Sequence, residues 1–298
     1  MTEEKSIALG TFDGLHLGHQ SVIELAEKSD YAPYILLFSE HPLKSIKGVA
    51  PPELLTDTVK DRLLLKFGVE KIVLDFNDIM NMPPEDFFYK ILLKQFNAKE
   101  LSCGENYTFG RNGDGNADLL LRLCLKNSVK LNIAKMQMLD GKLISSTAIR
   151  TSIQNGDLET ANKMLARPFS YDFKVVSGDR RGRLLGFPTI NQFFPDGFIE
   201  PRHGVYASTV TLNKKSYAAV TNFGLRPTIG TKSLRSETCI LGFSGDLYGK
   251  YVEVGLLSYM RPEIKFNNLN ELSAQISEDA KTSQKIFQNS IANCTQKR

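Results

Sequence analysis

Two histidines with glycines around them are the first residues of this sequence that could do chemistry. His16 and His19 are three residues apart, and Gly10, Gly14 and Gly18 interrupt the chain around them. If a helix begins here, that spacing lets both imidazoles face the same bound group. A helix N-terminus after a glycine loop favours anions because its backbone N–H groups and its dipole both attract negative charge. The pattern therefore predicts a phosphate site.

Two other roles remain open for the histidine pair. The two rings could ligate a metal with His41 as the third ligand, although no Glu or Cys lies at ligand spacing nearby. They could also be an ordinary hydrogen-bonded pair on the surface. The loop is neither a Walker loop, since no Gly-Lys-Ser/Thr follows it, nor the Gly-x-Gly-x-x-Gly dinucleotide motif.

Strands and helices alternate from residue 1 to about 155. Short apolar runs predict buried strands, and stretches with apolar residues at helical spacing predict helices between them. The expected strands are 6–9, 34–38, 71–74, 100–103 and 129–134, and the expected helices are 19–28, 56–67, 85–96 and 117–126. This alternation favours an open parallel sheet covered on both faces, with ligands at the carboxyl ends of the strands. The histidine loop, His41 and the 104–115 loop all follow strands, so we expect them at that edge.

The run Gly-x-Phe-Asp-Gly-x-His-x-Gly-His, residues 10–19, resembles the first motif of the nucleotidyltransferase superfamily. The form is that of bacterial bifunctional riboflavin kinase/FAD synthetases. The resemblance implies a Rossmann-like α/β/α nucleotidyltransferase domain that adenylylates FMN, with catalytic roles for His16 and His19. The loop residues that it implies for ATP binding are Gly10, Phe12, Asp13, Gly14 and Gly18.

The segment Ser145-Ser-Thr-Ala-Ile-Arg150 matches a second motif of the same family. Its hydroxyls stand where a helix begins, and an ordinary N-cap would also explain Ser145 or Ser146. The resemblance implies that Ser145, Ser146 and Thr147 bind the ATP triphosphate. It implies that Arg150 neutralises charge on the departing pyrophosphate.

The 104–115 loop is rich in glycine and polar residues, which argues against a place in the core. It resembles the loop on the flavin side of the family's site. The resemblance implies flavin contacts from Asn106 and Arg111, for which a plain surface connection is the alternative.

After about residue 155 the pattern changes to short strands. One helix is expected at 158–165, and the runs 204–212 and 216–222 flank the turn residues Asn213-Lys-Lys. Further strands are expected at 236–243 and 251–258, with a terminal helix at 268–293. Several short strands at this spacing favour a small antiparallel β-barrel. We therefore predict two domains, 1–155 and 156–298.

A second cluster of chemical groups lies in residues 177–191. Three arginines stand among glycines, and Thr189 and Asn191 are two apart, so on an extended chain their side chains point the same way. Both offer neutral oxygens, which suit a Mg²⁺ held largely by phosphates and water. The run Gly-Arg-x-Leu-Gly-Phe-Pro-Thr-x-Asn resembles the riboflavin kinase motif, and Asn-x-Gly-x-Arg-Pro-Thr at 222–228 resembles its flavin segment.

The resemblance assigns the remaining site residues of this half. For ATP it implies Gly178, Arg181, Gly182 and Arg183, for the flavin Asn222, Arg226 and Thr228, and for the metal Thr189 and Asn191. The catalytic carboxylate falls on Glu237. The alternatives are a solvated basic loop for the arginines and a surface carboxylate for Glu237.

This chain departs from the family pattern at two positions. Cys239 stands where His is common, which we interpret as a packing position. Lys174 stands where Gly is usual before the phosphate loop, and this leaves the geometry of the loop's entry open.

Composition sets the broad class of the protein. With 298 residues the chain is long enough for two domains, and 42% hydrophobic residues is typical of a globular protein. No apolar run approaches a membrane span, and the first residues lack a signal-peptide core, so we expect a cytoplasmic protein without membrane contact. Its four cysteines show no Cys-x-x-Cys spacing and are expected to be free thiols. The net charge of +4 fits an enzyme of anionic nucleotides, with no basic tract of the kind that marks nucleic-acid binders.

Together these features predict two transferases in tandem. The barrel would phosphorylate riboflavin to FMN with ATP and Mg²⁺, and the α/β domain would convert FMN and ATP to FAD and pyrophosphate. Small-molecule substrates are the expected partners, without nucleic acid, and protein partners cannot be predicted. Two alternatives stay open: the barrel could bind single-stranded nucleic acid, or one domain could be a non-catalytic regulator.

Overall fold

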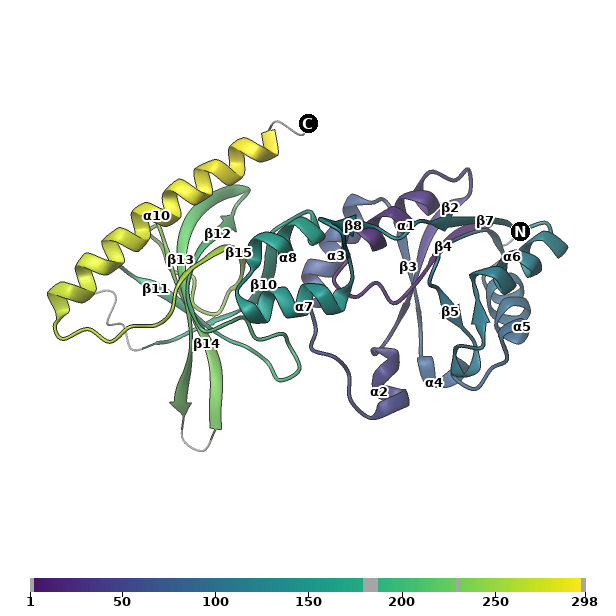
Figure 1. Ribbon diagram of the computed structural model, residues 1–298, viewed down its shortest axis with the longest axis horizontal. Helices are drawn as coiled ribbons and strands as arrows, with labels where there is room; N and C mark the ends of the chain where they lie inside the picture. Colours follow the sequence, from purple (N-terminus) through teal and green to yellow (C-terminus); the bar gives the residue numbers. More distant parts are fainter. Residues whose placement is uncertain (1–2, 179–186, 229–230, 296–298) are drawn as a thin grey trace. The chain divides into compact units, whose positions relative to one another are not determined.

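The computed structural model describes residues 3–178, 187–228 and 231–295 (Figure 1). Its contacts divide the chain into two compact units. We call residues 1–53 and 60–146 the N-terminal unit, and residues 54–59 and 147–298 the C-terminal unit. Each unit has its own sheet and its own core, and each is described by itself.

The N-terminal unit is built on a five-stranded parallel sheet. The strand order is β3-β2-β1-β4-β7, and every neighbouring pair is parallel. The strands are β1 (Lys5–Leu9), β2 (Ala32–Phe38), β3 (Glu70–Leu74), β4 (Ala98–Gly104) and β7 (Lys130–Ala134). The open parallel sheet expected from the sequence is thereby confirmed. Because the order reverses at β1 and β4, a crevice is expected where these two strands end.

Helices and short hairpins connect these strands. The helices are α1 (Leu17–Glu27), α2 (Pro42–Lys47), α3 (Asp57–Lys66), α4 (Phe76–Ile79), α5 (Pro84–Asp86) and α6 (Ala117–Lys126). The π-helical segment η1 (Phe87–Gln95) continues directly from α5, and η2 (Arg111–Gly113) is a 3₁₀ turn. The hairpins are β5 (Thr108–Phe109) with β6 (Gly115–Asn116), and β8 (Met138–Leu139) with β9 (Lys142–Leu143). The helix expected at 85–96 is therefore present, but most of it has π-helical hydrogen bonding.

Alternation along the central strands builds a core on each face of the sheet. Ile7 and Leu9 of β1 are buried in one apolar cluster with Phe88 of η1 and Leu120 of α6. The intervening Ala8 is fully buried too, and helix α1 contacts β1, β2 and β4. This two-sided burial fixes β1, so the loop that follows Leu9 begins from a rigid position.

The C-terminal unit is a closed six-stranded antiparallel barrel, as the sequence predicts, with helices before and after it (Figure 1). The strands are β10 (Phe169–Val176), β11 (Thr189–Phe193), β12 (Gly204–Leu212), β13 (Lys215–Thr228), β14 (Thr231–Ile240) and β15 (Tyr251–Arg261), in the order β10-β11-β14-β13-β12-β15. The helices are α7 (Ser146–Asn155), α8 (Leu158–Leu165) and α10 (Leu269–Thr295). The expected turn between β12 and β13 is present, with positive φ at Asn213 and Lys214, as a type I′ hairpin requires.

The barrel interior combines aromatic packing with a chain of hydroxyls. Tyr171 and Phe223 are fully buried, with ring centroids 5.9 Å apart. The hydroxyls of Ser208, Thr221 and Thr238 form successive hydrogen bonds of 2.7 and 2.9 Å across three strands. Successive residues of a strand face opposite sides of the sheet. Asn222, which follows Thr221, and Glu237, which precedes Thr238, therefore lie on the outer face of the barrel.

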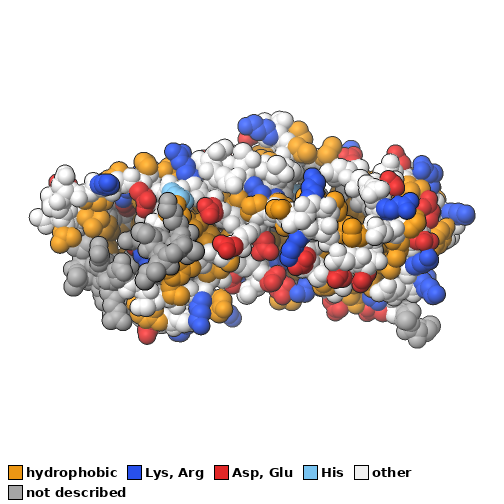
Figure 2. Space-filling view, turned by 90° about the horizontal axis from the view of Figure 1, so that it is seen from below, with side chains coloured by type: hydrophobic (Ala, Val, Ile, Leu, Met, Phe, Trp, Pro, Cys, Tyr) orange, Lys and Arg blue, Asp and Glu red, His pale blue; other side chains and the backbone are white. Residues whose placement is uncertain are grey.

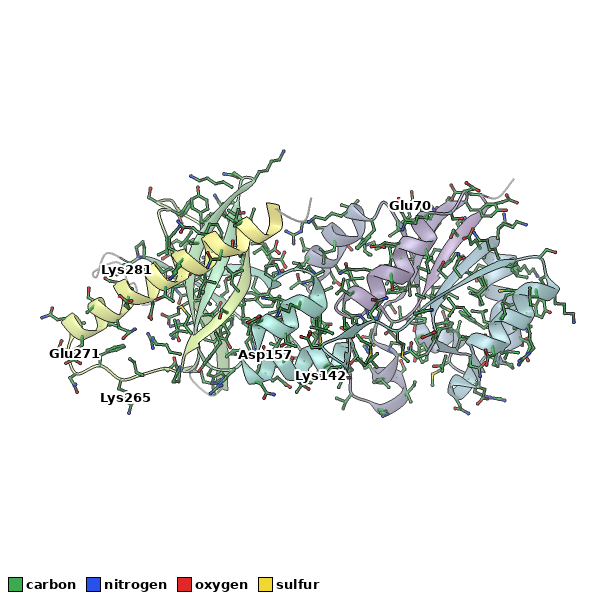
Figure 3. All side chains as sticks on the ribbon, turned by 45° about the horizontal axis from the view of Figure 1, so that its top comes forward. Glu70, Lys142, Asp157, Lys265, Glu271 and Lys281 are labelled. Atoms are coloured by element: carbon green, nitrogen blue, oxygen red, sulfur yellow. The ribbon has the colours of Figure 1, made fainter. Side chains whose placement is uncertain are left out.

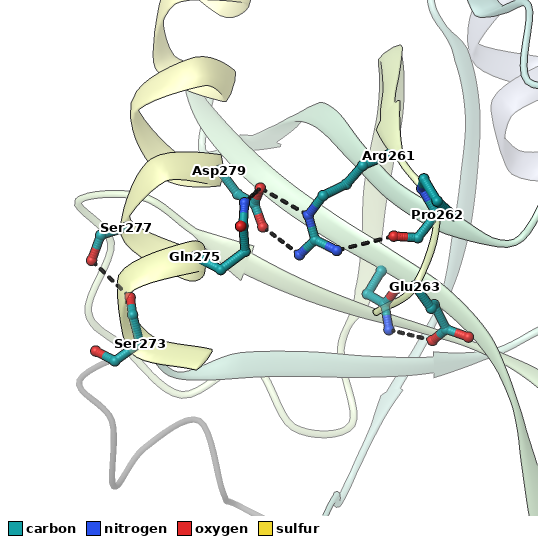
Figure 4. A network of polar contacts seen from close by, with 8 residues as sticks. Arg261, Pro262, Glu263, Ser273, Gln275, Ser277 and Asp279 are labelled. Atoms are coloured by element: carbon teal, nitrogen blue, oxygen red, sulfur yellow. Dashed lines mark hydrogen bonds and ion pairs between the residues drawn. The ribbon is translucent and has the colours of Figure 1, made fainter. Parts of the chain in front are cut away.

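The terminal helix is anchored to the barrel by an ion pair. Arg261 donates from Nε and a terminal nitrogen to the two carboxylate oxygens of Asp279, at 3.1 and 2.7 Å (Figure 4). The Ser283 hydroxyl donates to the carbonyl oxygen of Ala219 at 2.6 Å. Other charged side chains of α10, such as Glu271 and Lys281 (Figure 3), are exposed. The helix is therefore fixed to the barrel along one side.

The surface carries both signs of charge. On the face in Figure 2, Lys and Arg side chains alternate with Asp and Glu side chains, with hydrophobic side chains between them. Within the described part of the chain, no helix is both long and apolar enough to cross a bilayer.

Candidate active sites

The histidine loop of the N-terminal unit leaves the carboxyl end of β1, beside β4. Phe12 and Leu15 have φ values of 50° and 47°, and Gly14 has 81°. Left-handed backbone at two non-glycine residues in one short loop is uncommon, and such strain concentrates at functional sites. Both side chains are almost completely buried, so packing holds the loop in this conformation.

His16 and His19 lie against each other at the start of α1. Their rings are stacked, with centroids 3.7 Å apart and planes inclined by 16°. The backbone N–H of His19 donates to Nδ1 of His16 at 3.3 Å, so His16 is the N-cap of the helix. A nitrogen that accepts this bond carries no proton, which assigns the remaining ring proton of His16 to Nε2.

Burial keeps both imidazoles neutral. It lowers the pKa of His16 from 6.5 to about 4, against the opposing effect of the Asp13 charge. It lowers the pKa of His19 well below its usual range, and His16 and Lys60 act in the same direction. Nδ1 of His19 is buried and has no hydrogen-bond partner among the described residues. The pair therefore offers neutral ring N–H groups near a helix N-terminus, a suitable environment for phosphate oxygens.

The structure places the hydroxyl motif partly beside this loop. The Ser146 hydroxyl donates to the carbonyl oxygen of Asp13 at 2.7 Å, which joins the two sequence motifs within the N-terminal unit. Ser145 directly precedes α7 and Ser146 is its first residue. Thr147 is exposed in the first turn of α7 and Arg150 is buried one turn later. Thr147 and Arg150 are counted with the C-terminal unit, so their placement beside the loop stays a prediction.

The expected flavin residues of the first domain lie in the connection after β4. Asn106 is exposed, and a Cβ atom at Gly104 would lie 3.1 Å from its Oδ1. Arg111 is exposed in η2, and its backbone N–H donates to the carbonyl oxygen of Met82 at 2.7 Å. Since β4 is the parallel neighbour of β1, this connection leaves the same edge of the sheet as the histidine loop.

Four of the residues predicted for the barrel, Thr189, Asn191, Asn222 and Glu237, lie on its outer face in neighbouring rows across β11, β14 and β13. The register pairs Asn191 with Glu237 and Glu237 with Asn222, which forms the central row. The adjacent rows are Thr189, Cys239 and Val220 on one side, and Phe193, Arg235 and Gly224 on the other. Residues of one row lie directly opposite one another. Three residues that are far apart in the sequence are thereby neighbours.

Strands β11 and β14 both contribute to the lining of a cavity of about 270 Å³. Thr189 and Asn191 are part of its lining, together with residues of the turn between β14 and β15. The turn residues in the lining are Phe243, Ser244, Gly245, Asp246, Leu247 and Tyr248. Asp246 accepts a 3.0 Å hydrogen bond from the backbone N–H of Tyr248, which orders this wall. The strands expected at 236–243 and 251–258 predict a connection here, but the sequence does not indicate that this connection lines a cavity.

Part of the expected phosphate loop can be placed. Gly178 passes so close to Asn191 that a Cβ atom would lie 2.3 Å from the amide nitrogen, so only glycine fits here. Arg181, Gly182 and Arg183 lie outside the described residues. Arg226 and Thr228 belong to β13, but their side chains also lie outside what the structure describes.

Glu237 and Asn222 both have charged partners. The Arg235 guanidinium donates to Oε1 of Glu237, with Arg235 about nine-tenths buried and Glu237 one-quarter exposed. The Asn222 amide donates to Oε1 of Glu263 at 3.0 Å, and its own Oδ1 is buried without a partner among the described residues. Neither Arg235 nor Glu263 is predicted from the sequence. For Arg235 a signal exists, because residues two apart on a strand share a face.

Two metal sites were considered from the sequence, one at the histidines with His41 and one at Thr189 and Asn191. In the described part of the chain, no three or more His, Cys, Asp or Glu side chains are grouped to hold a metal. His41, the third ligand considered for zinc, instead accepts a 3.2 Å hydrogen bond from the backbone N–H of Leu43 and caps α2. Thr189 and Asn191 are in the lining of the cavity, and neutral hydroxyl and amide oxygens suit a Mg²⁺ ion held mainly by phosphates.

Comparison with known proteins also divides the chain into two parts. Residues 1–148 match the family model of FAD synthetase, and residues 165–287 match that of riboflavin kinase. A bifunctional riboflavin kinase/FMN adenylyltransferase from Bacillus subtilis (strain 168) is 32% identical over 96% of this chain and 94% of its own. The chain belongs to this family. The Escherichia coli (strain K12) member is 31% identical over 94% of this chain and 92% of its own.

A solved structure matches nearly all of this family member. It is described as a macrolide-efflux protein from Streptococcus pneumoniae, is 30% identical, and covers 95% of both chains with a TM-score of 0.85. The two chains share the fold, and macrolide efflux is attributed to the Streptococcus pneumoniae protein alone.

Proposed function

We propose that this chain makes FAD in two steps, with one active site in each unit. The C-terminal unit phosphorylates riboflavin to FMN, and the N-terminal unit adenylylates FMN to FAD. The observation that supports this best is the row Asn191–Glu237–Asn222, which sets a carboxylate between two amides beside the cavity. The family models for the two activities match the two halves separately.

In the kinase step, Glu237 accepts the proton of the riboflavin 5′-hydroxyl. The bond from that oxygen to the γ-phosphorus of ATP forms as the bond to the ADP oxygen breaks. Thr189 and Asn191 would hold Mg²⁺, which neutralises phosphate charge when bound. Gly178 leaves room for the chain to approach Asn191, and Arg181, Gly182 and Arg183 are proposed phosphate contacts. Catalysis then consists of alignment and charge stabilisation.

In the adenylyl step, a phosphate oxygen of FMN attacks the α-phosphorus of ATP and pyrophosphate leaves. His16 and His19 donate ring N–H groups to the phosphate oxygens, where the negative charge develops. Gly10, Phe12, Asp13, Gly14 and Gly18 shape the loop that receives ATP. The Ser145 hydroxyl extends the proposed phosphate site, and the Ser146 hydroxyl would join it on releasing its bond to the Asp13 carbonyl oxygen. No base is needed, because the attacking phosphate is already an anion.

Other assignments stay predictions from the resemblance. These are the phosphate roles of Thr147 and Arg150, the flavin contacts of Asn106, Arg111, Asn222, Arg226 and Thr228, a requirement for Mg²⁺, the domain boundary after residue 155, and a cytoplasmic location without nucleic-acid partners.

The proposal is tested by the flavins that the full chain makes. We expect FMN and then FAD when riboflavin, ATP and Mg²⁺ are supplied and the products are separated by chromatography. With Glu237→Gln, FMN formation should fall by about 10²–10⁴-fold, the usual contribution of a general base. Glu253→Gln, on strand β15 of the same barrel, is the matched control. Unchanged FMN formation with Glu237→Gln would contradict the proposed role.

A further inference from the structure

The carboxylate of Glu237 is held by a residue to which the proposed reaction assigns no role. Arg235 lies two residues earlier on β14, on the same outer face, and its guanidinium donates to Oε1 of Glu237. The side chain of Arg235 is 9% exposed, while that of Glu237 is 25% exposed. The buried member of the pair is therefore the arginine, and the more exposed member is the carboxylate.

Arg235 is itself fixed in place. It stands in the row between Phe193 and Gly224. The Glu263 carboxylate lies over Gly224, where a Cβ atom would come within 2.6 Å of its Oε1. Its Nε is buried and makes no hydrogen bond to any described residue. The guanidinium stays charged at every accessible pH. A buried cation needs a counter-charge. The bond from the guanidinium to the Glu237 carboxylate is therefore strongly favoured over a conformation in which the carboxylate turns away to solvent.

Such a pair is weak evidence for stability. Burying two charges costs desolvation energy, and apolar residues in the same space are often at least as stable. An arginine in a row with Phe193 therefore calls for another explanation. The pair does supply a carboxylate with a fixed orientation, because the guanidinium holds one of its two oxygens.

We infer that Arg235 is a positioning residue for the kinase step, which rests on the proposed role of Glu237 as the proton acceptor. Arg235 holds Oε1 and thereby fixes the orientation of the carboxylate toward the 5′-hydroxyl. A general base must lie within hydrogen-bond distance of the proton it takes, at about 2.6–3.2 Å. A displacement of about 1 Å can cost about 10²-fold in rate.

The test measures FMN formation by four Arg235 and Glu237 variants of the full chain. The single variants are Arg235→Met, Arg235→Gln and Arg235→Lys, and the double variant is Arg235→Met with Glu237→Gln. Arg202→Met is the matched control, since Arg202 is an exposed arginine of the same unit that stacks on Tyr259. Conversion of supplied FMN to FAD serves as an internal control in the other unit. Circular dichroism and thermal unfolding identify variants that fold normally.

We expect the neutral variants to lower kcat for FMN formation by about 10- to 10²-fold, because the carboxylate loses its orientation. The KM values for riboflavin and ATP should change little. Arg235→Lys should recover most of the rate, since it keeps a charged donor. The double variant should be no slower than Glu237→Gln alone, because Arg235 acts through that carboxylate.

Two results would overturn the inference. One is a normal kcat in a folded neutral variant while Glu237→Gln is slow. The other is a double variant whose loss is the product of the two single losses, because Arg235 would then act independently of Glu237. If Glu237→Gln itself keeps its rate, the proposed function fails instead, so the two failures are distinguishable. Should Arg235→Met not fold, Arg235→Gln and Arg235→Lys decide by the same criteria.

Discussion

Acidification should destabilise the N-terminal unit through His16. This ring is 7% exposed, and burial lowers its pKa from 6.5 to about 4. Below about pH 6.5 the unfolded chain binds a proton that the folded unit refuses, so the free energy of unfolding falls as pH falls. The loss is complete only near the pKa of the folded state. Replacing His16 by Asn removes this titration and keeps a good N-cap for α1, since Asn accepts from the same backbone N–H groups.

The size of the effect follows from the two pKa values. Each tenfold difference in proton affinity corresponds to about 1.4 kcal/mol, so the full range from 6.5 to about 4 amounts to about 3 kcal/mol. Between about pH 7.5 and about pH 4.5, most of it, about 2.5 kcal/mol, should be lost. His19 adds to the loss in both chains, because burial, the largest cause of its lowered pKa, is present in both.

Hydrogen exchange can measure this unit alone. Peptides covering β1 and β4 report its opening free energy, once exchange rates are corrected for the intrinsic effect of pH. Wild type should lose about 2.5 kcal/mol more than His16→Asn over this pH range. His41→Asn makes the same chemical change at the half-buried N-cap of α2, outside the histidine loop, and controls for the substitution itself. Equal acid destabilisation of wild type and His16→Asn would refute the reasoning.

Three shorter predictions concern the C-terminal unit. Gly178→Ala should slow FMN formation and leave FAD formation from FMN unchanged, because its Cβ would lie 2.3 Å from the Asn191 amide; equal rates in a steady-state assay would contradict this. Asp279→Ala should lower the barrel's free energy of unfolding by about 3 kcal/mol, because it leaves the partly buried Arg261 without its counter-charge; a loss below about 0.5 kcal/mol in urea unfolding would show that the pair is unimportant. Cys239→His should change the FMN-forming rate little, because Cys239 lies beside Glu237 on its strand but outside the lining of the cavity; a large change would place this position in the chemistry.

Much of the fold can be predicted because local signals agree with the tertiary packing. Helix α8 runs over Leu158–Leu165 as expected, since Asp157 caps its start and its apolar spacing is regular. Helix α1 begins at Leu17, two residues before the expected start, because its N-cap is a histidine outside the usual set of Ser, Thr, Asp and Asn. The π-helical bonding of η1 has no sequence signal that periodicity could detect.

The candidate sites are less accessible to sequence reasoning. Motifs indicate Asn191, Glu237 and Asn222 separately, but only the register of three strands shows that they form one row. The stacking of His16 on His19 and the bond from Ser146 to Asp13 also depend on tertiary structure. The spacing of Arg235 and Glu237 indicates a shared face, but their ion pair depends on side-chain conformations that the sequence does not give.

The most direct test of two separate active sites is to mix two defective chains. Glu237→Gln alone should make FAD from riboflavin about 10²–10⁴-fold more slowly than wild type but should still convert supplied FMN. His19→Ala alone should accumulate FMN, because loss of one phosphate donor typically costs about 10²–10³-fold in rate. A mixture of the two variants, given riboflavin, ATP and Mg²⁺, should form FAD, since FMN made by one chain can be used by the other. If the mixture makes no FAD, or if either substitution slows both steps equally in a folded chain, the assignment of one reaction to each unit is wrong.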